Sequence, residues 1–245
     1  MIYINRLNKH FLDRKIDFVI CDFDRTITKS DSATSWGIIP SSNMVDPNLK
    51  KESELIFNHY RPIELDNTIS FENKSYNMKK WALDQVNLYY RYNITKELLY
   101  KILDTNDKLV VRESFDTFIK KLYNKGIRLY IVSAGIYDVI KYVLIKNNIM
   151  YDNIQIISNH LGYTNNVISG IDGTLLHSCN KNTIDLSISD DEYGLLFGDQ
   201  VEDKLLGEKY NTIDIGFMNN NNKNYDIVLT GNSSFNNVSK ILIKE

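Results

Sequence analysis

The segment Val19–Thr28, which reads VICDFDRTIT, decides how the fold of this chain is interpreted. A run of apolar residues ends there in two aspartates one residue apart, Asp22 and Asp24, and Thr26 follows them. Carboxylates this close repel each other and resist leaving water. The pair therefore indicates either an exposed acidic turn or a site built to hold a cation.

Short apolar runs rich in β-branched residues recur along the chain and predict strands. They cover residues 18–20, 129–132, 154–157, 195–197, 212–217 and 226–229. Because the runs are continuous rather than alternating, they are typical of parallel strands buried on both faces. Helical periodicity lies between them at 113–126, where Gly126 fits a helix C-cap, and at 137–148. The alternation predicts an α/β fold with a doubly wound parallel sheet.

The region 31–110 departs from this alternation. Its clearest pattern is NMKKWALDQVNLYY (77–90), which places its apolar residues on one helical face. The region separates the first predicted strand from the second by far more residues than a crossover needs. We predict a helical module at 31–110, inserted after the first strand of a core made by residues 1–30 and 111–245. The Asn-rich stretch 219–224 is interpreted as a solvated loop.

Composition excludes several classes of protein. The chain has 245 residues, 43% of them hydrophobic, and a net charge of −2, so no basic surface indicates a nucleic-acid polymer as partner. No apolar run approaches the roughly 20 residues that span a membrane, and the first residues lack the apolar core of a signal peptide. Two cysteines make no disulfide framework, and four histidines show no zinc-ligand spacing. We expect a cytoplasmic protein, by default a monomer.

Three polar clusters directly follow predicted strands, and a lysine lies between the second and the third. The clusters are Asp22 with Asp24, Ser133 with Ala134 and Gly135, and Asp199 with Asp203. The lysine is Lys181. Each alone has an ordinary explanation as an acidic loop, a small-residue turn, a solvated lysine or an aspartate that caps a helix. Ligands of open parallel sheets bind outside the carboxyl ends of the strands, so the clusters in this order predict one active site.

The residue types fit transfer of a phosphoryl group. An aspartate that attacks an anionic phosphomonoester meets like-charge repulsion, which Mg²⁺ bound to carboxylates and phosphate oxygen relieves. We expect Asp22 to be the nucleophile and Asp24 the general acid and base, with its main-chain carbonyl facing the metal. Asp199 completes the predicted metal site.

The remaining polar residues have supporting roles in this hypothesis. Asp203 orients metal-bound water, and Ser133 and the amide of Ala134 hold phosphate oxygens. Lys181 offsets negative charge on the nucleophile and the phosphoryl group. Thr26 braces the loop or donates a hydrogen bond to the nucleophile.

With these residues placed, the chain resembles the haloacid dehalogenase superfamily, whose four motifs appear in order as DFDRT, SAG, a lysine and GDQVED. Within it the sequence is most similar to the cytosolic 5′-nucleotidase III family of pyrimidine 5′-nucleotidases. That similarity rests on two segments that are more specific than the four superfamily motifs, HYRPIELD (59–66) and SGIDGTLLHSCNKN (169–182).

The resemblance implies a Rossmann-like core with an inserted helical cap. It implies Mg²⁺-dependent hydrolysis of nucleoside 5′-monophosphates, with pyrimidines expected, and it makes Glu64 a cap residue that contacts the base or sugar. From the sequence alone, a solvated loop carboxylate is the favoured explanation of Glu64. Trp81 and the Tyr89–Tyr90 pair offer a stacking surface for a base, although their spacing also suits the core of the cap.

Two alternatives remain open at the level of sequence. One core serves many substrates through variation of the cap, so another small phosphorylated metabolite is possible. A non-catalytic binding protein on the same fold is disfavoured by the complete set of charged motif residues. The segment KSDSATSWGIIPSS (29–42) departs from animal relatives near the cap, which leaves the base open between cytosine, uracil and methylated guanine.

Overall fold

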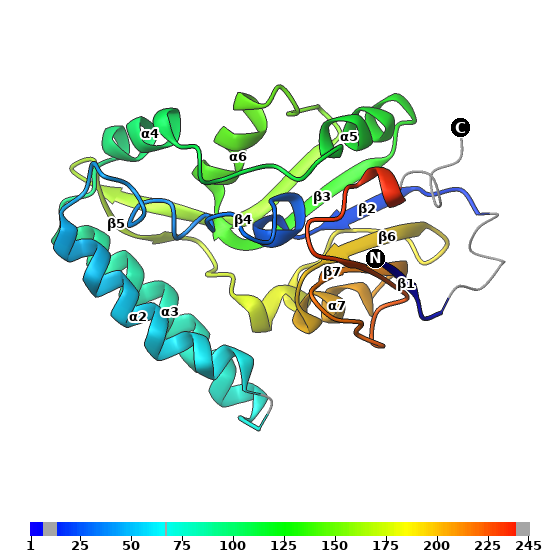
Figure 1. Ribbon diagram of the computed structural model, residues 1–245, viewed down its shortest axis with the longest axis horizontal. Helices are drawn as coiled ribbons and strands as arrows, with labels where there is room; N and C mark the ends of the chain where they lie inside the picture. Colours follow the sequence, from blue (N-terminus) through cyan, green and yellow to red (C-terminus); the bar gives the residue numbers. More distant parts are fainter. Residues whose placement is uncertain (7–13, 67, 239–245) are drawn as a thin grey trace.

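The computed structural model describes residues 1–6, 14–66 and 68–238; the parts of the predicted domains at 7–13, 67 and 239–245 lie outside the described residues. Figure 1 shows a sheet with helices on both faces, and its strands follow the order β1-β8-β7-β6-β2-β3-β4-β5. The strands are β1 (Ile2–Ile4), β2 (Phe18–Cys21), β3 (Arg128–Ile136), β4 (Ile154–Thr164), β5 (Val167–Asp172), β6 (Tyr193–Gly198), β7 (Asn211–Met218) and β8 (Ile227–Thr230).

The centre of the sheet is parallel and its two edges are antiparallel. Strand β2 pairs in parallel with β3 on one side and with β6 on the other. Strands β1 and β5 pair antiparallel with β8 and β4. The predicted doubly wound parallel sheet is thus confirmed for its central part, and the two antiparallel edges were not predicted.

The β4–β5 hairpin explains one of these differences. Strand β4 continues to Thr164, beyond the predicted end at residue 157, and only Asn165 and Asn166 separate it from β5. Both asparagines have positive φ, 48° and 69°, as the two central residues of a tight hairpin turn require. The turn, rather than an apolar run, sets this pairing.

Helices cover both faces of the sheet. The helical elements are η1 (Phe23–Ile27), α2 (Pro47–Leu65), α3 (Phe71–Arg91), α4 (Lys96–Thr105), α5 (Phe115–Asn124), α6 (Tyr137–Lys146), η2 (Ser178–Thr183) and α7 (Val201–Gly207). Helices α5 and α6 pack on one face, where Phe118 and Ile140 join the larger buried cluster with Val19. Helix α7 packs on the other face, where Leu206 lies in a cluster with Phe18.

Helix α5 ends as its sequence predicts. Gly126 has a φ of +67°, and its N–H donates to the carbonyl of Tyr123 at 3.0 Å. The N–H of Ile127 donates to the carbonyl of Leu122, also at 3.0 Å. This pair of bonds is a Schellman motif, in which glycine adopts the left-handed conformation without a steric cost. The chain then turns directly into β3.

The predicted helical module contains a hairpin of α2 and α3, which project from the sheet side by side (Figure 1). Helix α2 begins at Pro47 after the N-cap Asp46, and α3 begins after the N-cap Ser70. Helix α4 instead lies against α6: Tyr100 donates to Asp138 at 3.0 Å. The division of the chain at 31 and 110 remains a prediction.

The order of the strands brings three loops together. The chain leaves β2 toward β3 on one side and later returns to β6 on the other side of β2. The loops that follow β2, β3 and β6 therefore meet at one edge of the sheet, at its topological switch point. Within the described part of the chain, no helix is long and apolar enough to cross a membrane.

Candidate active site

The turn after β2 separates the two predicted catalytic aspartates. Asp22 follows the strand directly, and its N–H donates to the carbonyl of Phe197 on β6 at 2.9 Å. Arg25 then adopts a φ of 64°, and its N–H donates to the hydroxyl of Thr28 at 2.8 Å. A positive φ is uncommon for a residue with a side chain and is held here by the surrounding bonds. The turn leaves Asp22 and Asp24 with different partners.

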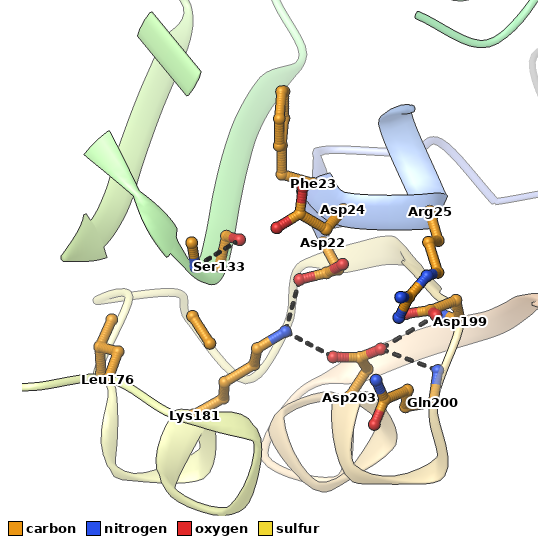
Figure 2. A network of polar contacts seen from close by, with 12 residues as sticks. Asp22, Phe23, Asp24, Arg25, Ser133, Leu176, Lys181, Asp199, Gln200 and Asp203 are labelled. Carbon is orange, nitrogen blue, oxygen red and sulfur yellow. Dashed lines mark hydrogen bonds and ion pairs between the residues drawn. The ribbon is translucent and has the colours of Figure 1, made fainter. Parts of the chain in front are cut away.

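Lys181 lies between two buried carboxylates (Figure 2). Its Nζ is 2.5 Å from Oδ1 of Asp22 and 2.6 Å from Oδ1 of Asp203. Burial alone would lower the pKa of Lys181, but the carboxylates of Asp203 and Asp22 outweigh burial and raise that pKa. The ammonium therefore stays charged, and it offsets part of the negative charge of this cluster of carboxylates.

The carboxylates of the cluster retain an affinity for further positive charge. Burial raises the pKa of Asp22 to about 7 even though Lys181 lowers it. Burial, followed by repulsion from Asp203 and Asp22, raises the pKa of Asp199 well above its usual value. A single lysine is thus not enough to favour the ionised form of all the clustered acids.

Asp203 holds the loop between β6 and α7. Its Oδ2 accepts hydrogen bonds from the N–H groups of Asp199 and Gln200, each at 3.1 Å, while Oδ1 contacts Lys181 (Figure 2). One carboxylate therefore fixes both the lysine and the loop that carries Asp199. The role predicted for Asp203, orienting metal-bound water, remains a prediction.

Three acids could share one metal ion. Oxygen atoms of Asp22, Asp199 and Asp203 all lie within 4.8 Å of one another. Carboxylate oxygens are the hard ligands that Mg²⁺ prefers, and three clustered carboxylates carry more negative charge than Lys181 alone offsets. The residues present therefore fit the predicted metal. The side chain of Asp24 lies outside this group, so any contact of Asp24 with the metal would have to use its main chain.

The residues predicted to bind phosphate lie in the C-terminal part of β3, where its pairing with β4 is irregular between Val132 and Ile136. The hydroxyl of Ser133 accepts from the N–H of Gly135 at 3.1 Å. The carbonyl of Ala134 accepts from Nε1 of Trp36 at 2.9 Å and from Nδ2 of Asn159 at 2.7 Å. Both Ser133 and Ala134 line the same cavity as Asp22. This part of β3 is thus fixed from two sides before any substrate binds.

Asp24 is oriented by a residue that the sequence did not single out. Oδ1 of Asp24 accepts from the N–H of Ser35 at 2.8 Å, and Oδ2 accepts from the hydroxyl of Ser35 at 2.6 Å. Ser35 is fully buried, and a Cβ on Gly135 would approach its hydroxyl to 2.3 Å. Position 135 in β3 therefore requires a glycine, because any larger residue would collide with Ser35.

We expect Ser35→Ala to lower kcat about tenfold with little change in KM. The variant removes one of two bonds that hold Asp24 and adds no bulk next to Gly135. Steady-state kinetics on the best phosphomonoester measure the effect. Ser41→Ala, which removes a hydroxyl bonded only locally to the carbonyl of Ile38, is the matched control. Equal kinetics of the Ser35 variant and wild type would contradict the positioning role.

Thr26 is buried, and its hydroxyl has no hydrogen-bond partner among the described residues. The structure therefore does not show the brace predicted for this side chain. The turn is held instead by Thr28 and by Arg112, whose Nε donates to the carbonyl of Thr26 at 2.8 Å. A role for Thr26 toward the nucleophile remains a prediction.

The cavity extends from the cluster of Asp22, Lys181 and Asp203 to the α2–α3 hairpin. Glu64 lines it, is 9% exposed and forms an ion pair with Arg61. Trp81 also lines the cavity and stacks on Tyr60 with ring centroids 6.1 Å apart. Of the two predicted tyrosines, Tyr89 is buried in the module and Tyr90 is 52% exposed; neither lines the cavity. Of the three aromatic residues considered for stacking on a base, Trp81 is the one that lines the cavity.

Sequence reasoning missed other residues of this cavity. They are Thr34, Trp36, Ser53, Phe57, Arg61, Met78, Gln85 and His177. Most of them come from helix faces that periodicity alone assigns equally well to a core. The sequence did contain an indication that Arg61 belongs to the site, because Arg61 lies three residues before Glu64 in the distinctive HYRPIELD segment.

The fold and the placement of the acids define a class of protein. Asp22 and Asp199 directly follow the parallel strands β2 and β6, and Ser133 lies in the C-terminal part of β3. A lysine and a helical hairpin complete the cavity, as in phosphohydrolases of the haloacid dehalogenase type. A family model described as pyrimidine 5′-nucleotidase (UMPH-1) matches residues 24–244. The chain therefore belongs to the pyrimidine 5′-nucleotidase family.

Curated relatives are similar over most of their length. The 7-methylguanosine phosphate-specific 5′-nucleotidase A of Xenopus laevis is 29% identical over 251 residues, which cover 91% of this chain and 86% of the relative. The human 7-methylguanosine phosphate-specific 5′-nucleotidase is 26% identical over 249 residues, with 91% and 83% covered.

Solved structures agree with the fold. Cytosolic 5′-nucleotidase IIIB bound to cytidine has a TM-score of 0.79 at 22% identity and covers 92% of this chain and 84% of its own. A substrate-bound phosphoserine phosphatase has a TM-score of 0.58 at 16% identity, with 93% and 99% covered. At these identities the likeness shows the fold alone.

Proposed function

We propose that this protein hydrolyses nucleoside 5′-monophosphates to nucleoside and phosphate, and that Asp22 carries the phosphoryl group in between. The observation that carries the proposal is the buried Asp22–Lys181–Asp203 cluster beside Asp199, facing a cavity that the α2–α3 hairpin closes. Membership of the pyrimidine 5′-nucleotidase family supports the substrate class. We propose residues 1–30 and 111–245 as the catalytic core and 31–110 as the cap.

A magnesium ion would be held by Asp22, Asp199 and the main-chain carbonyl of Asp24, with Asp203 supporting the loop. When bound, it supplies positive charge that offsets repulsion between the acids and the phosphate. The clustered oxygens of Asp22, Asp199 and Asp203 support this assignment.

The first chemical step would use the two aspartates after β2. A carboxylate oxygen of Asp22 attacks phosphorus and forms an aspartyl phosphate, while the bond from phosphorus to the 5′ oxygen breaks. Asp24, in its protonated form, gives its proton to that oxygen as the nucleoside leaves. Burial raises the pKa of Asp24, which favours the protonated form that this step needs.

The second step would regenerate the enzyme. Water attacks phosphorus, Asp24 takes a proton from the water, and the bond to Asp22 breaks to release phosphate. Lys181 fixes the carboxylate of Asp22 through Oδ1 and offsets charge on the phosphoryl group in both steps. Ser133 and the amide of Ala134 would hold phosphate oxygens.

Glu64 is proposed as the residue that contacts the base or sugar. It lines the same cavity as Asp22 and lies near the C-terminal end of α2, on the hairpin. The alternative is a phosphatase of another small metabolite, and the phosphoserine phosphatases among the structural neighbours favour it as a second candidate. Phosphate release from a panel of nucleoside monophosphates, sugar phosphates and phosphoserine tests the choice. Preference for either of the last two would overturn the nucleotide assignment.

We expect removal of divalent cations with EDTA to abolish phosphate release and added Mg²⁺ to restore it. Mg²⁺ should also raise the melting temperature of the protein, because an ion that binds only the folded state stabilises it by mass action. The Asp199→Asn variant, tested in parallel, should lose most of this shift. Full activity in EDTA, or an equal shift in the variant, would contradict the metal site.

A further inference from the structure

The cavity wall on the cap is apolar or neutral except for one ion pair. Helix α2 contributes side chains at intervals of four, four and three residues, and α3 contributes a facing set. They are Ser53, Phe57, Arg61 and Glu64 from α2, and Met78, Trp81, Ala82 and Gln85 from α3. Ser53 and Gln85 bond to each other, with Nε2 of Gln85 donating to the serine hydroxyl at 3.1 Å. Among these lining residues, charge is confined to Arg61 and Glu64.

Arg61 and Glu64 neutralise each other inside the cavity. Nη1 of Arg61 contacts Oε2 of Glu64, and the side chains are 23% and 9% exposed. The two residues are three apart on one helix, so the pair is local to the end of α2 and does not depend on closure of the hairpin onto the core. A carboxylate this buried without a partner would attract any cationic group of a ligand. With Arg61 beside it, the cavity wall has no net charge.

This neutral pair favours some nucleobases over others. An uncharged base presents both donors and acceptors at its edge, such as the exocyclic amino group of cytosine. The free lone pairs of Glu64 can accept from an amino group, and the remaining N–H groups of Arg61 can donate to a carbonyl oxygen or a ring nitrogen of the base. A base with a positive charge would have to compete with the guanidinium for Glu64 and would leave one cation unpaired, which is costly away from water.

We propose that Arg61 determines specificity: the Arg61–Glu64 pair selects nucleotides with an uncharged base and rejects the cationic 7-methylguanine base. The inference rests on the proposed nucleotidase function and deepens it. It separates this chain from the relatives named as 7-methylguanosine phosphate-specific. Arg61 acts here by its charge, through Glu64 and on the base, and takes no part in phosphoryl transfer.

The central comparison of the test is between GMP and 7-methyl-GMP, which differ in charge and by one methyl group. Values of kcat/KM are measured for CMP, GMP and 7-methyl-GMP in mildly acidic buffer, where the 7-methylguanine ring keeps its positive charge. In the wild type we expect kcat/KM for 7-methyl-GMP to be lower than for GMP. Arg61→Met should raise the ratio of 7-methyl-GMP to GMP about tenfold, because it leaves Glu64 free to pair with the cation. Arg61→Lys keeps the charge and should keep the ratio.

A matched pair on the same hairpin controls for general effects of removing an arginine. Arg91 contacts Glu52 at 2.6 Å, lies outside the cavity and is 58% exposed. Arg91→Met should leave the substrate ratio unchanged. Calorimetric binding of cytidine and 7-methylguanosine to each folded variant, checked by circular dichroism, gives a readout independent of turnover. Only Arg61→Met should strengthen binding of 7-methylguanosine relative to cytidine.

The outcomes separate the two proposals. If the wild type hydrolyses CMP and GMP but prefers 7-methyl-GMP, or if Arg61→Met lowers kcat/KM for all three nucleotides by one common factor, the role of Arg61 is overturned while the nucleotidase function stands. If no nucleotide is hydrolysed and another phosphomonoester is, both proposals fail.

Discussion

Asp22→Asn is expected to lower kcat at least a thousandfold while the protein remains folded. The amide has nearly the shape of the carboxylate but cannot form an acyl phosphate, so the proposed route has no first step. The substitution also removes one of three clustered carboxylates and leaves the ion pair of Lys181 with Asp203 in place. We therefore expect a denaturation midpoint no lower than that of the wild type.

Asp214→Asn provides the matched control for this experiment. Asp214 is another buried aspartate, on β7, 6% exposed and outside the catalytic cavity. Burial raises its pKa to about 6, so a neutral amide suits its surroundings. This variant should keep its activity. Measurable turnover by purified Asp22→Asn at more than a few per cent of wild type would contradict the role of Asp22 as nucleophile.

Lys181→Met is expected to destabilise the fold by about 3–5 kcal/mol as well as to abolish activity, because it leaves buried carboxylates without their cation. The lysine is 5% exposed and contacts both Asp22 and Asp203. Urea denaturation followed by circular dichroism measures the free energy of unfolding. Substitution of the exposed Lys120 by Met should change that free energy by less than about 0.5 kcal/mol.

The decrease in the free energy of unfolding caused by Lys181→Met should depend on pH and on Mg²⁺. Without the lysine, the pKa of Asp22 in the folded state rises further above the unfolded value, so the folded state binds the proton more tightly. Stability is then lost as pH rises through the folded pKa and regained as pH falls toward the unfolded value near 4. Added Mg²⁺ should restore part of the stability at neutral pH. An unfolding free energy equal to wild type would show that Lys181 does not balance these acids.

Much of the catalytic site was predictable because local sequence determines it. An apolar run that ends in polar residues marks both a buried strand and its carboxyl end, and parallel strands place those ends at one edge. The structure accordingly places Asp22 and Asp199 directly after β2 and β6, and Ser133 in the C-terminal part of the neighbouring β3. Lys181 does not follow a predicted strand. It was predicted from its position between the second and the third polar cluster along the chain.

The residues that sequence reasoning missed depend on contacts between distant segments. Ser35 reaches Asp24 because the linker to the hairpin folds back across the turn after β2, and Trp36 bonds to Ala134, 98 positions away. No local pattern reports such contacts. The lining of the cap is set by how α2 and α3 face each other, and helical periodicity shows only which residues share a face.

The central claim is that Asp22 itself accepts the phosphoryl group, and its most direct test is to trap that intermediate. The enzyme is mixed with a nucleoside monophosphate and Mg²⁺, quenched with acid within one turnover and reduced with borohydride, which converts an aspartyl phosphate to homoserine. Peptide mass spectrometry should find homoserine at position 22 in the wild type and not in Asp22→Asn. Efficient turnover with no modification at position 22, or with the modification at another aspartate, would contradict the account.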